Sequence, residues 1–361
     1  MPPRILVAPL GWGLGHATRC IAIATEIERQ GGEVIWASDG RALQLLRHEY
    51  PNHQTLEMPS YDVNYGSGSM VWNIGLQLPK IIRAIRAEHQ RLRQIVKQQS
   101  ITAIISDNRY GCYHPEVPSI FVTHQPNLIV PNMVLTWLAR QAQAKLLQKF
   151  DQCWIPDYPE LAESLAGTLA HGGIVDTLPN VSYIGPLTRF RAAEKKTSEY
   201  EMVAVLSGPE PQRTFLEQKL LQQLANLPYR VLIVRGIPDS SVIKKISLNI
   251  DMVSSLYTDK LADVINNATL VISRPGYSTI MDLVGLNSGV RALFIPTPGQ
   301  TEQEYLAKYF EHRGIAASCQ QDTFELSTCL ARAFRVSGFQ DTRSLEQALL
   351  PKAISKLFSC S

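Results

Sequence analysis

The fold class is decided by residues 4–40, RILVAPLGWGLGHATRCIAIATEIERQGGEVIWASDG. An apolar run at 4–10 precedes a glycine-rich turn, a helical stretch over His16–Gln30 and a second β-branched run at 33–38. A strand, a helix and a strand in this order are typical of parallel β-sheets, because parallel neighbours need a long crossover connection. We therefore expect an α/β protein.

The same alternation continues along the chain. Further strands are expected at 102–106, 119–123, 153–156, 181–185, 202–207, 230–234, 269–273 and 291–296. Further helices are expected over Gln77–Gln99, Met133–Phe150, Arg213–Asn226, Lys260–Asn266, Thr279–Gly285 and Gln303–Arg313. The pattern predicts two series of parallel strands with helices between them.

A polar stretch at 188–201 (TRFRAAEKKTSEYE) separates the two series and has no strand pattern. We interpret it as a linker between a domain of residues 1–187 and a domain of residues 202–342. Residues 343–361 are expected to form a C-terminal helix that can cross back to the first domain. Two Rossmann-like domains of this kind would have parallel sheets facing across a cleft at the carboxyl ends of their strands.

Composition excludes several classes of protein. Hydrophobic residues make up 45% and charged residues 19%, which suits folded cores rather than a disordered chain. No apolar run approaches the roughly 20 residues of a membrane span, and a net charge of +3 argues against a dedicated nucleic-acid binder. The six cysteines form no C-x-x-C pair, so we expect neither a disulfide framework nor a zinc site, and a cytoplasmic location.

The first motif, GWGLGH (11–16), follows the first strand and opens a helix. Its glycines allow a sharp turn and a close approach to an anion. It is close to the dinucleotide fingerprint G-x-G-x-x-G, with Asp39 as the acid, but His16 stands where that fingerprint requires glycine. An imidazole here suits proton transfer or contact with an anion. The alternative is a structural turn with an exposed histidine.

The second motif, SRPGYST (273–279), follows the strand at 269–273 and opens another helix. Arg274 offers a fixed charge, and the glycine and hydroxyls after it offer donors at a helix start, a combination that suits phosphate. Asp282 lies in the next turn, from which its carboxylate can reach a ribose diol. An ordinary helix start with an exposed acid is the alternative.

Two further turns have weaker signals. The stretch QTEQEY (300–305) places amides and acids after the strand at 291–296, a composition that suits sugar hydroxyls. Ser207 and Gly208 repeat the glycine turn at the start of the second series. Each of these turns is also compatible with an ordinary loop.

Taken together, the order and spacing of the four motifs resemble those of GT-B glycosyltransferases of the family 28 type, which include the lipid-linked N-acetylglucosaminyltransferase of peptidoglycan synthesis. The resemblance covers most of the chain and is strongest over Leu256–Ala307. It implies that the second domain binds a UDP-sugar as donor substrate and that the first binds the acceptor, with no other cofactor.

The resemblance also assigns residues. The expected donor-binding positions are Arg189, Ser207, Gly208, Tyr257, Thr258, Arg274, Gly276, Ser278, Thr279, Asp282, Gln303 and Glu304. The expected acceptor-binding positions are Gly13, Gly15, His124, Gln125 and Asn127. The sequence departs from the family pattern at three places. Asp for Glu at 282 is a shorter acid that can still reach the diol, Gln-Glu for Gln-Gln at 303–304 leaves the donor sugar open, and H-Q-P-N for H-E-Q-N at 124–127 leaves the acceptor open.

A mechanism follows from these groups. The sequence has no D-x-D motif for a metal, so the helix start at 273–279 and Arg274 are expected to stabilise the departing diphosphate without one. His16 is the first candidate base, because its ordinary pKa of about 6.5 lies near cytoplasmic pH. Asp107, at the end of the strand at 102–106, is the reserve. The resemblance implies a single displacement with inversion.

The acceptor can be lipid-linked, because residues 74–99 combine one acid, Glu88, with several bases and apolar residues. The bases are Lys80, Arg83, Arg86, Arg91, Arg93 and Lys97, and the apolar residues are Ile74, Leu76, Leu78, Ile81, Ile82 and Ile85. Such a helix either binds the inner face of a membrane peripherally or packs its apolar side on the sheet. Residues 127–150 add apolar and basic character.

Two other functions remain open. One is a UDP-sugar epimerase of the same fold, which needs no acceptor, and the other is a non-catalytic nucleotide-sugar-binding protein. A dehydrogenase ranks last because of His16. The sequence leaves the donor sugar, the acceptor and the oligomeric state undetermined.

Overall fold

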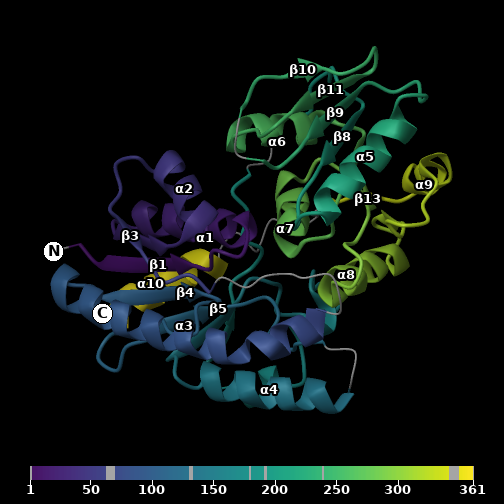
Figure 1. Ribbon diagram of the computed structural model, residues 1–361. Helices are drawn as coiled ribbons and strands as arrows, with labels where there is room; N and C mark the ends of the chain where they lie inside the picture. The colour runs from purple at the N-terminus through teal and green to yellow at the C-terminus, as the bar shows by residue number, and fades with distance from the viewer. Residues whose placement is uncertain are drawn as a thin grey trace. The chain divides into compact units, whose positions relative to one another are not determined.

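The computed structural model describes residues 2–61, 70–129, 133–178, 180–190, 193–237, 240–340 and 349–360. The expected apolar side chains of Ile74, Leu76 and Leu78 lie outside the described part. The chain divides into two compact units, Met1–Thr188 with Arg343–Ser361, and Arg189–Thr342. Each is a parallel-sheet α/β unit (Figure 1), which confirms the predicted fold class.

The first unit is built on a sheet with the strand order β3-β2-β1-β4-β5-β6-β7, in which all the pairings are parallel. The strands are β1 (Arg4–Pro9), β2 (Glu33–Ser38), β3 (Thr55–Glu57), β4 (Ala103–Asp107), β5 (Ser119–Val122), β6 (Gln152–Ile155) and β7 (Val181–Tyr183). The register places Pro9 of β1 opposite Asp107 of β4. The glycine-rich turn after β1 therefore leaves the sheet beside the last residue of β4.

Helices cover both faces of this sheet. They are α1 (Leu14–Arg29), α2 (Gly40–Glu49), α3 (Met70–Gln99) and α4 (Met133–Leu147), with the short 3-10 helices η1 (Gly167–Leu169) and η2 (Val175–Thr177) before β7. Alternate strand residues such as Leu6 and Ile35 pack in one apolar cluster with Leu92 and Ile95 of α3. Figure 1 shows α1 and α2 on the opposite face.

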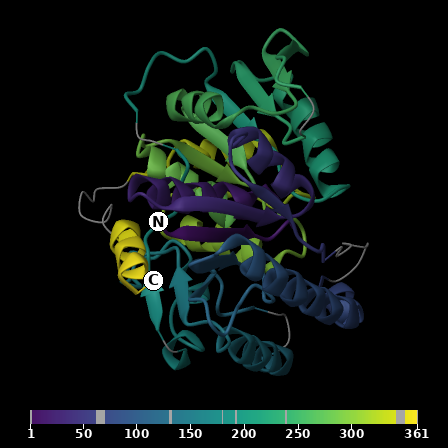
Figure 2. The same cartoon turned by 90° about the vertical axis from the view of Figure 1, so that its left-hand side faces the viewer.

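The C-terminal helix α10 (Leu349–Cys360) belongs to the first unit and contacts α1. Gln30 donates from Nε2 to the Pro351 carbonyl over 2.9 Å and accepts from the Ser355 hydroxyl over 2.9 Å. A Cβ on Gly32 would clash with the ring of Phe358, so the turn after α1 needs glycine there. Figure 2 shows α10 from the side.

The second unit is built on a sheet with the order β10-β11-β9-β8-β12-β13-β14, parallel except for the β10–β11 pair. The strands are β8 (Met202–Val205), β9 (Val231–Val234), β10 (Lys244–Lys245), β11 (Ile250–Val253), β12 (Leu270–Ser273), β13 (Arg291–Phe294) and β14 (Ala317–Ser318). The helices are α5 (Gln212–Leu224), α6 (Thr258–Asn267), α7 (Tyr277–Leu286), α8 (Thr301–His312) and α9 (Leu326–Ala333). Leu216 and Leu220 of α5 and Leu330 of α9 share one buried cluster with the sheet.

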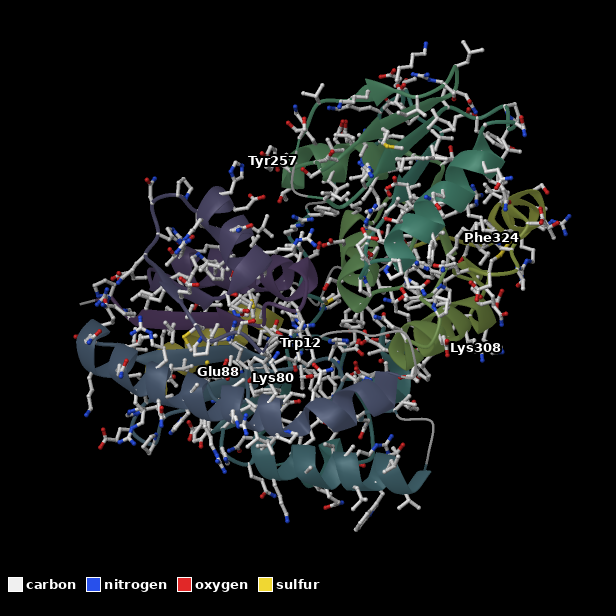
Figure 3. The ribbon with its side chains drawn as sticks, viewed as in Figure 1. Trp12, Lys80, Glu88, Tyr257, Lys308 and Phe324 are labelled. Carbon is white, nitrogen blue, oxygen red and sulfur yellow. A yellow bond between two sulfur atoms is a disulfide. The ribbon has the colours of Figure 1, made fainter. Side chains whose placement is uncertain are left out.

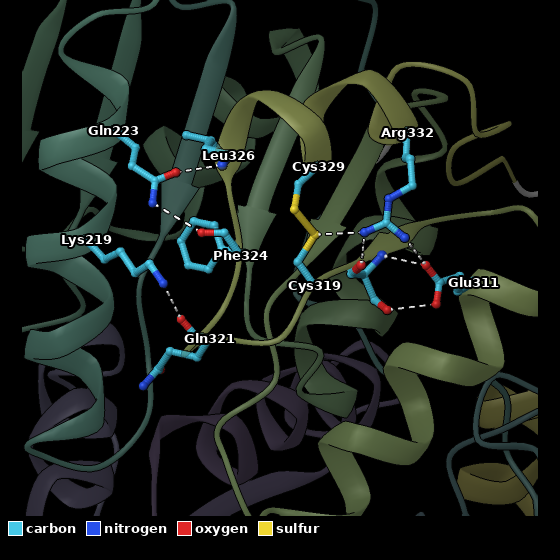
Figure 4. The surroundings of a disulfide bond; sticks show 10 residues. Lys219, Gln223, Glu311, Cys319, Gln321, Phe324, Leu326, Cys329 and Arg332 are labelled. Atoms are coloured by element: carbon cyan, nitrogen blue, oxygen red, sulfur yellow. Dashed lines mark hydrogen bonds and ion pairs between the residues drawn. A yellow bond between two sulfur atoms is a disulfide. The ribbon is translucent and has the colours of Figure 1, made fainter.

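A disulfide joins Cys319, directly after β14, to Cys329 of α9 (Figure 4). The expectation of no disulfide framework did not foresee this single bond. The two residues lie ten apart, a spacing that has no signature of its own. The loop between them is also held by Lys219, which donates to the carbonyls of Gln321 and Asp322.

Within the described residues, no helix has both the length and the apolar character that a membrane span requires.

Candidate functional site

The glycine-rich turn after β1 rests on a buried ion-pair network. The Arg109 guanidinium bonds the carboxylates of Asp39 and Glu88 and donates from Nε to the Pro9 carbonyl over 2.9 Å. A Cβ on Gly11 would clash with the Asp39 carboxylate, so this position needs glycine. Asp39 therefore packs against the turn and binds Arg109, so its carboxylate is not available to bind a ribose. Glu88, marked in Figure 3, is buried, and burial raises its pKa to about 8.

The turn brings His16, in the first turn of α1, against the end of β4. Nδ1 of His16 lies 2.8 Å from Oδ1 of Asp107. The Asp107 side chain is fully buried, whereas 21% of the His16 side chain is exposed. An aspartate behind a histidine fixes the ring and leaves Nε2 as the nitrogen that can exchange a proton.

Arg19 lies one turn further along α1 and is 2% exposed. Its Nε and Nη2 bond the two carboxylate oxygens of Asp107. Nη1 lies 2.8 Å from Nδ1 of His124, which follows β5, and Nη2 lies 3.0 Å from Nδ1 of His16. Four side chains from three segments thus form one buried cluster, which we call the histidine cluster: His16, Arg19, Asp107 and His124.

The pKa values of Asp107 and His16 in the histidine cluster indicate different roles for the two residues. Burial opposes the charge of Asp107, but Arg19 and His16 outweigh it and hold the Asp107 pKa well below its ordinary value. Burial lowers the pKa of His16; Asp107 acts against this change and Arg19 supports it. A fully buried carboxylate that binds an arginine is a poor proton acceptor. The environment of Asp107 therefore favours a role as partner of His16 over the expected role as reserve base.

The other expected acceptor positions have different surroundings. Asn127 donates from Nδ2 to the carbonyls of Thr168, His171 and Gly172 and accepts from the amide of Ile174. Its amide group holds the loop around η1 and η2, which indicates a structural role, and the expected contact with an acceptor stays a prediction. The remaining expected positions are half-buried Gln125, Gly13 with open space at its Cβ, and Gly15, whose carbonyl accepts from the Thr18 hydroxyl.

In the second unit, Arg274 follows β12 but its guanidinium lies inside the protein. Nη1 donates to the Ile295 carbonyl over 2.8 Å, and Nη2 donates to the Gln212 carbonyl and to Oε1 of Gln321. Burial lowers the pKa of Arg274 to about 10. The expected direct contact between Arg274 and a phosphate does not fit this orientation, because the side chain joins three segments of its own unit.

Three buried polar atoms of this region have no hydrogen-bond partner among the described residues. They are Nε of Arg274 itself and the hydroxyl oxygens of Ser273 and Thr297. All three residues are at least 97% buried. A Cβ on Gly208 would lie 3.6 Å from the Thr297 hydroxyl, and Gly208 has a φ of 103°, which favours glycine. Within the described residues, the end of β12 and the turns after β12 and β13 thus carry buried hydrogen-bonding groups without a partner.

The expected sugar-binding pair at the start of α8 supports the turn after β13. Oε1 of Gln303 accepts from the Thr297 amide over 2.8 Å, and Oε1 of Glu304 accepts from the Gly299 amide over 2.9 Å. These contacts use one oxygen of each side chain. Gln303 and Glu304 of α8 therefore lie against the turn that contains Thr297.

The remaining donor positions lie along the same unit. Arg189 donates from Nη1 to the Thr258 hydroxyl over 3.1 Å at the start of α6, and Tyr257, marked in Figure 3, is exposed. Ser207 is exposed after β8, and Ser278, Thr279 and Asp282 are half-buried on α7, which begins after Gly276. The structure thus brings the expected donor residues to the turns and helix starts of one unit.

The long helix α3 packs its apolar side on the first unit and exposes its bases. Ile81 and Ile85 pack against a buried cluster, whereas Ile82 and the bases Lys80, Arg83 and Arg86 are exposed. Packing on the unit, the second alternative above, therefore accounts for Ile81 and Ile85 but not for Ile82. An exposed apolar surface occurs instead at the start of α4, where Val134, Trp137 and Leu138 are each more than half exposed.

Sequence reasoning missed Arg19, Thr297 and Gln321. Arg19 carries a usable signal, because it lies three residues after His16 and so shares its helix face. Thr297 and Gln321 have no local signal, since their importance depends on strands that are distant in sequence.

Comparison with known proteins finds a family match in the second half of the chain. Residues 203–349 match the model of the glycosyltransferase family 28 C-terminal domain. The chain is 25% identical over 329 residues to a Methanosarcina acetivorans protein named as an uncharacterized glycosyltransferase, which covers 86% of this chain and 82% of the relative.

Two further comparisons concern bacterial enzymes. The chain is 26% identical over 328 residues to the UDP-N-acetylglucosamine--N-acetylmuramyl-(pentapeptide) pyrophosphoryl-undecaprenol N-acetylglucosamine transferase of Pasteurella multocida, covering 88% of this chain and 84% of that enzyme. The crystal structure of Acinetobacter baumannii MurG superimposes with a TM-score of 0.57 at 16% identity, covering 99% of this chain and 100% of MurG. The fold is therefore GT-B.

Proposed function

We propose that this chain, a glycosyltransferase of the GT-B type with a family 28 C-terminal domain, moves a sugar from a UDP-sugar to an acceptor hydroxyl with inversion and without a metal. The observation that carries the proposal is the partly exposed imidazole of His16, held by buried Asp107 at the end of β4. A protein that only binds nucleotide sugars has no need of a histidine held in this way.

In this proposal His16 is the base. Its Nδ1–H donates to Asp107, which leaves the lone pair on Nε2 for the proton of the acceptor hydroxyl. Because burial lowers the His16 pKa, the neutral ring predominates at pH 7. Asp107 stabilises the imidazolium that forms after proton transfer and stays ionised itself.

The donor phosphates bind in the second unit. The turn before α7 supplies backbone N–H groups at a helix start, where the helix dipole favours an anion. Gly208 allows a phosphate to approach the backbone closely, and the unpartnered hydroxyls of Ser273 and Thr297 gain the hydrogen bonds that they lack. These groups stabilise the charge that builds on the departing diphosphate. Arg274 holds the turns together and contributes its charge from within.

The rest of the donor follows from the family resemblance. Asp282 on α7 binds the ribose diol, Tyr257 and Thr258 flank the uracil, and Gln303 and Glu304 bind the sugar. Arg189 positions Thr258 through its 3.1 Å hydrogen bond.

The acceptor is lipid-linked in this proposal. The named activity of the Pasteurella multocida relative includes a pyrophosphoryl-undecaprenol acceptor. Here the exposed apolar start of α4 and the exposed bases of α3 belong to the same unit as the proposed base, and the two features together favour an anionic lipid surface.

Purified full-length protein tests the proposal. We expect UDP release from one member of a UDP-sugar panel that depends on a detergent-solubilised lipid-linked acceptor, with an inverted anomeric centre in the product by NMR. An epimerised sugar without acceptor would establish the epimerase instead. Binding with neither reaction, across the donor and acceptor panels, would establish a nucleotide-sugar-binding protein.

A further inference from the structure

The contacts of Arg19 define which nitrogen of each neighbouring histidine carries a proton. A guanidinium only donates hydrogen bonds, so Nδ1 of His124, 2.8 Å from Nη1, must accept. An imidazole whose Nδ1 accepts is neutral and carries its proton on Nε2.

The opposite holds for His16. A carboxylate that is ionised only accepts, so Nδ1 of His16, 2.8 Å from Asp107, must donate and carries the proton. Nη2 of Arg19, which donates to the same oxygen of Asp107, also lies 3.0 Å from this nitrogen and has a second N–H. The 2.8 Å contact between Nδ1 and an ionised carboxylate oxygen is favourable only with the proton on Nδ1, because two lone pairs would otherwise repel. Asp107 therefore accepts from Arg19 and His16 together, and Nε2 of His16 keeps its lone pair.

We propose that Arg19 is a positioning residue that fixes opposite tautomers in the two histidines, His16 as a hydrogen-bond acceptor at Nε2 and His124 as a donor at Nε2. The inference rests on the proposed function of His16 for its catalytic meaning, but the tautomers themselves can be measured without substrate. Arg19 is almost completely buried and acts through the two rings.

Arg19 also balances the charge that faces His16. The groups around His16 are Arg19 on α1, Asp107 on β4 and His124 after β5, with the Cys20 thiol 3.4 Å from Asp107. Without Arg19, the full charge of Asp107 acts on His16 and stabilises the imidazolium. The protonated ring cannot act as a base, so loss of Arg19 should slow the reaction at neutral pH.

The experiment records long-range ¹H–¹⁵N imidazole spectra of the ¹⁵N-labelled full chain as a function of pH. Wild type is compared with Arg19→Lys, Arg19→Met and a control, Arg29→Met, whose side chain on α1 is 64% exposed. We expect wild type and the control to show His16 protonated at Nδ1 and His124 protonated at Nε2. In Arg19→Met, His16 should titrate at higher pH and kcat at neutral pH should fall about tenfold or more.

Arg19→Lys keeps the positive charge, so His16 should titrate as in wild type. It loses the separate guanidinium nitrogens that bond Asp107 and His124, so His124 should become a mixture of tautomers. This variant decides the matter if Arg19→Met does not fold. Unchanged tautomers of both rings in Arg19→Lys, or the same tautomer on His16 and His124 in wild type, would overturn the inference. If the spectra behave as expected but His16→Ala transfers sugar normally, the proposed function fails and the role of Arg19 in the cluster stands.

Discussion

The candidate sites of the two units differ in how their buried polar groups are satisfied. In the first unit, the histidine cluster satisfies its own charges, since Asp107 bonds both Arg19 and His16 and Arg19 also bonds His124. In the second unit, buried hydroxyls of Ser273 and Thr297 lack partners within the described residues. A satisfied cluster keeps one geometry through a reaction, whereas unsatisfied donors gain from an arriving anion. We infer that the first unit holds a preorganised base and that the second is completed by its ligand.

The largest expected effect comes from His16→Ala. The loss of a general base should lower kcat about 10²- to 10⁴-fold, with the UDP affinity of the second unit unchanged. His48→Ala, at the exposed end of α2, is the matched control. Steady-state kinetics and calorimetry with UDP measure the two halves separately. A fall in UDP affinity as large as the fall in kcat would contradict the assignment of the base to the first unit and of UDP binding to the second.

Thr297→Val tests the other side of the comparison. The change removes a buried hydroxyl that bonds none of the described residues, so thermal stability should stay the same or rise. UDP affinity should fall about tenfold, because a hydrogen bond to a charged phosphate contributes roughly 1–3 kcal/mol. Calorimetry and thermal unfolding check both effects, with exposed Thr328→Val as control. A variant with wild-type UDP affinity would remove Thr297 from the donor site.

The Asp282→Ala variant addresses the ribose contact. If Asp282 binds the diol, its loss leaves hydroxyl groups unpaired, at a cost of roughly 1–3 kcal/mol and about tenfold in UDP affinity. The affinity for 2′,3′-dideoxy-UDP should then be the same in wild type and variant. Equal losses for UDP and for the dideoxy analogue would show that Asp282 acts on the fold of α7 instead.

A smaller effect is expected from pH. Burial is the largest cause that lowers the His16 pKa from its ordinary 6.5, and the neutral ring is the active form. Activity should therefore persist at neutral pH and fall only as the pH drops below about 6.5. The pH profile of kcat/KM measures this limb. A midpoint above pH 6.5 would mean that burial does not lower the pKa of His16.

The smallest effect is expected from chelation. Helix-start donors of the second unit supply the charge stabilisation in this account, so EDTA should leave turnover unchanged. Coupled measurement of UDP release with and without EDTA is sufficient. Activity that disappears with EDTA and returns with magnesium or manganese would contradict the proposal that helix-start donors stabilise the departing diphosphate without a metal.

The same contrast explains what the sequence could predict. Most strands and the main helices were predictable because β-branched runs and helical stretches alternate. The helices α2 and α9 and the strands β3, β10, β11 and β14 were missed. His16 was found because it interrupts a glycine-rich motif. Arg19 was not, since its burial depends on the register of β1 against β4.

The second unit shows the opposite limit. The motif at 273–279 predicted that Arg274 would contact phosphate, but the guanidinium bonds Ile295, Gln212 and Gln321 from three other segments. No local pattern reveals partners that only the fold brings together. The disulfide between Cys319 and Cys329 was missed for a similar reason.

Hydrogen–deuterium exchange with and without UDP tests the central claim, that the second unit alone binds the nucleotide, most directly. We predict protection of the peptides that contain residues 205–210, 273–282 and 296–304, with the turn at 11–16 unchanged. Protection of the turn at 11–16 with no change at the three second-unit turns would contradict the account.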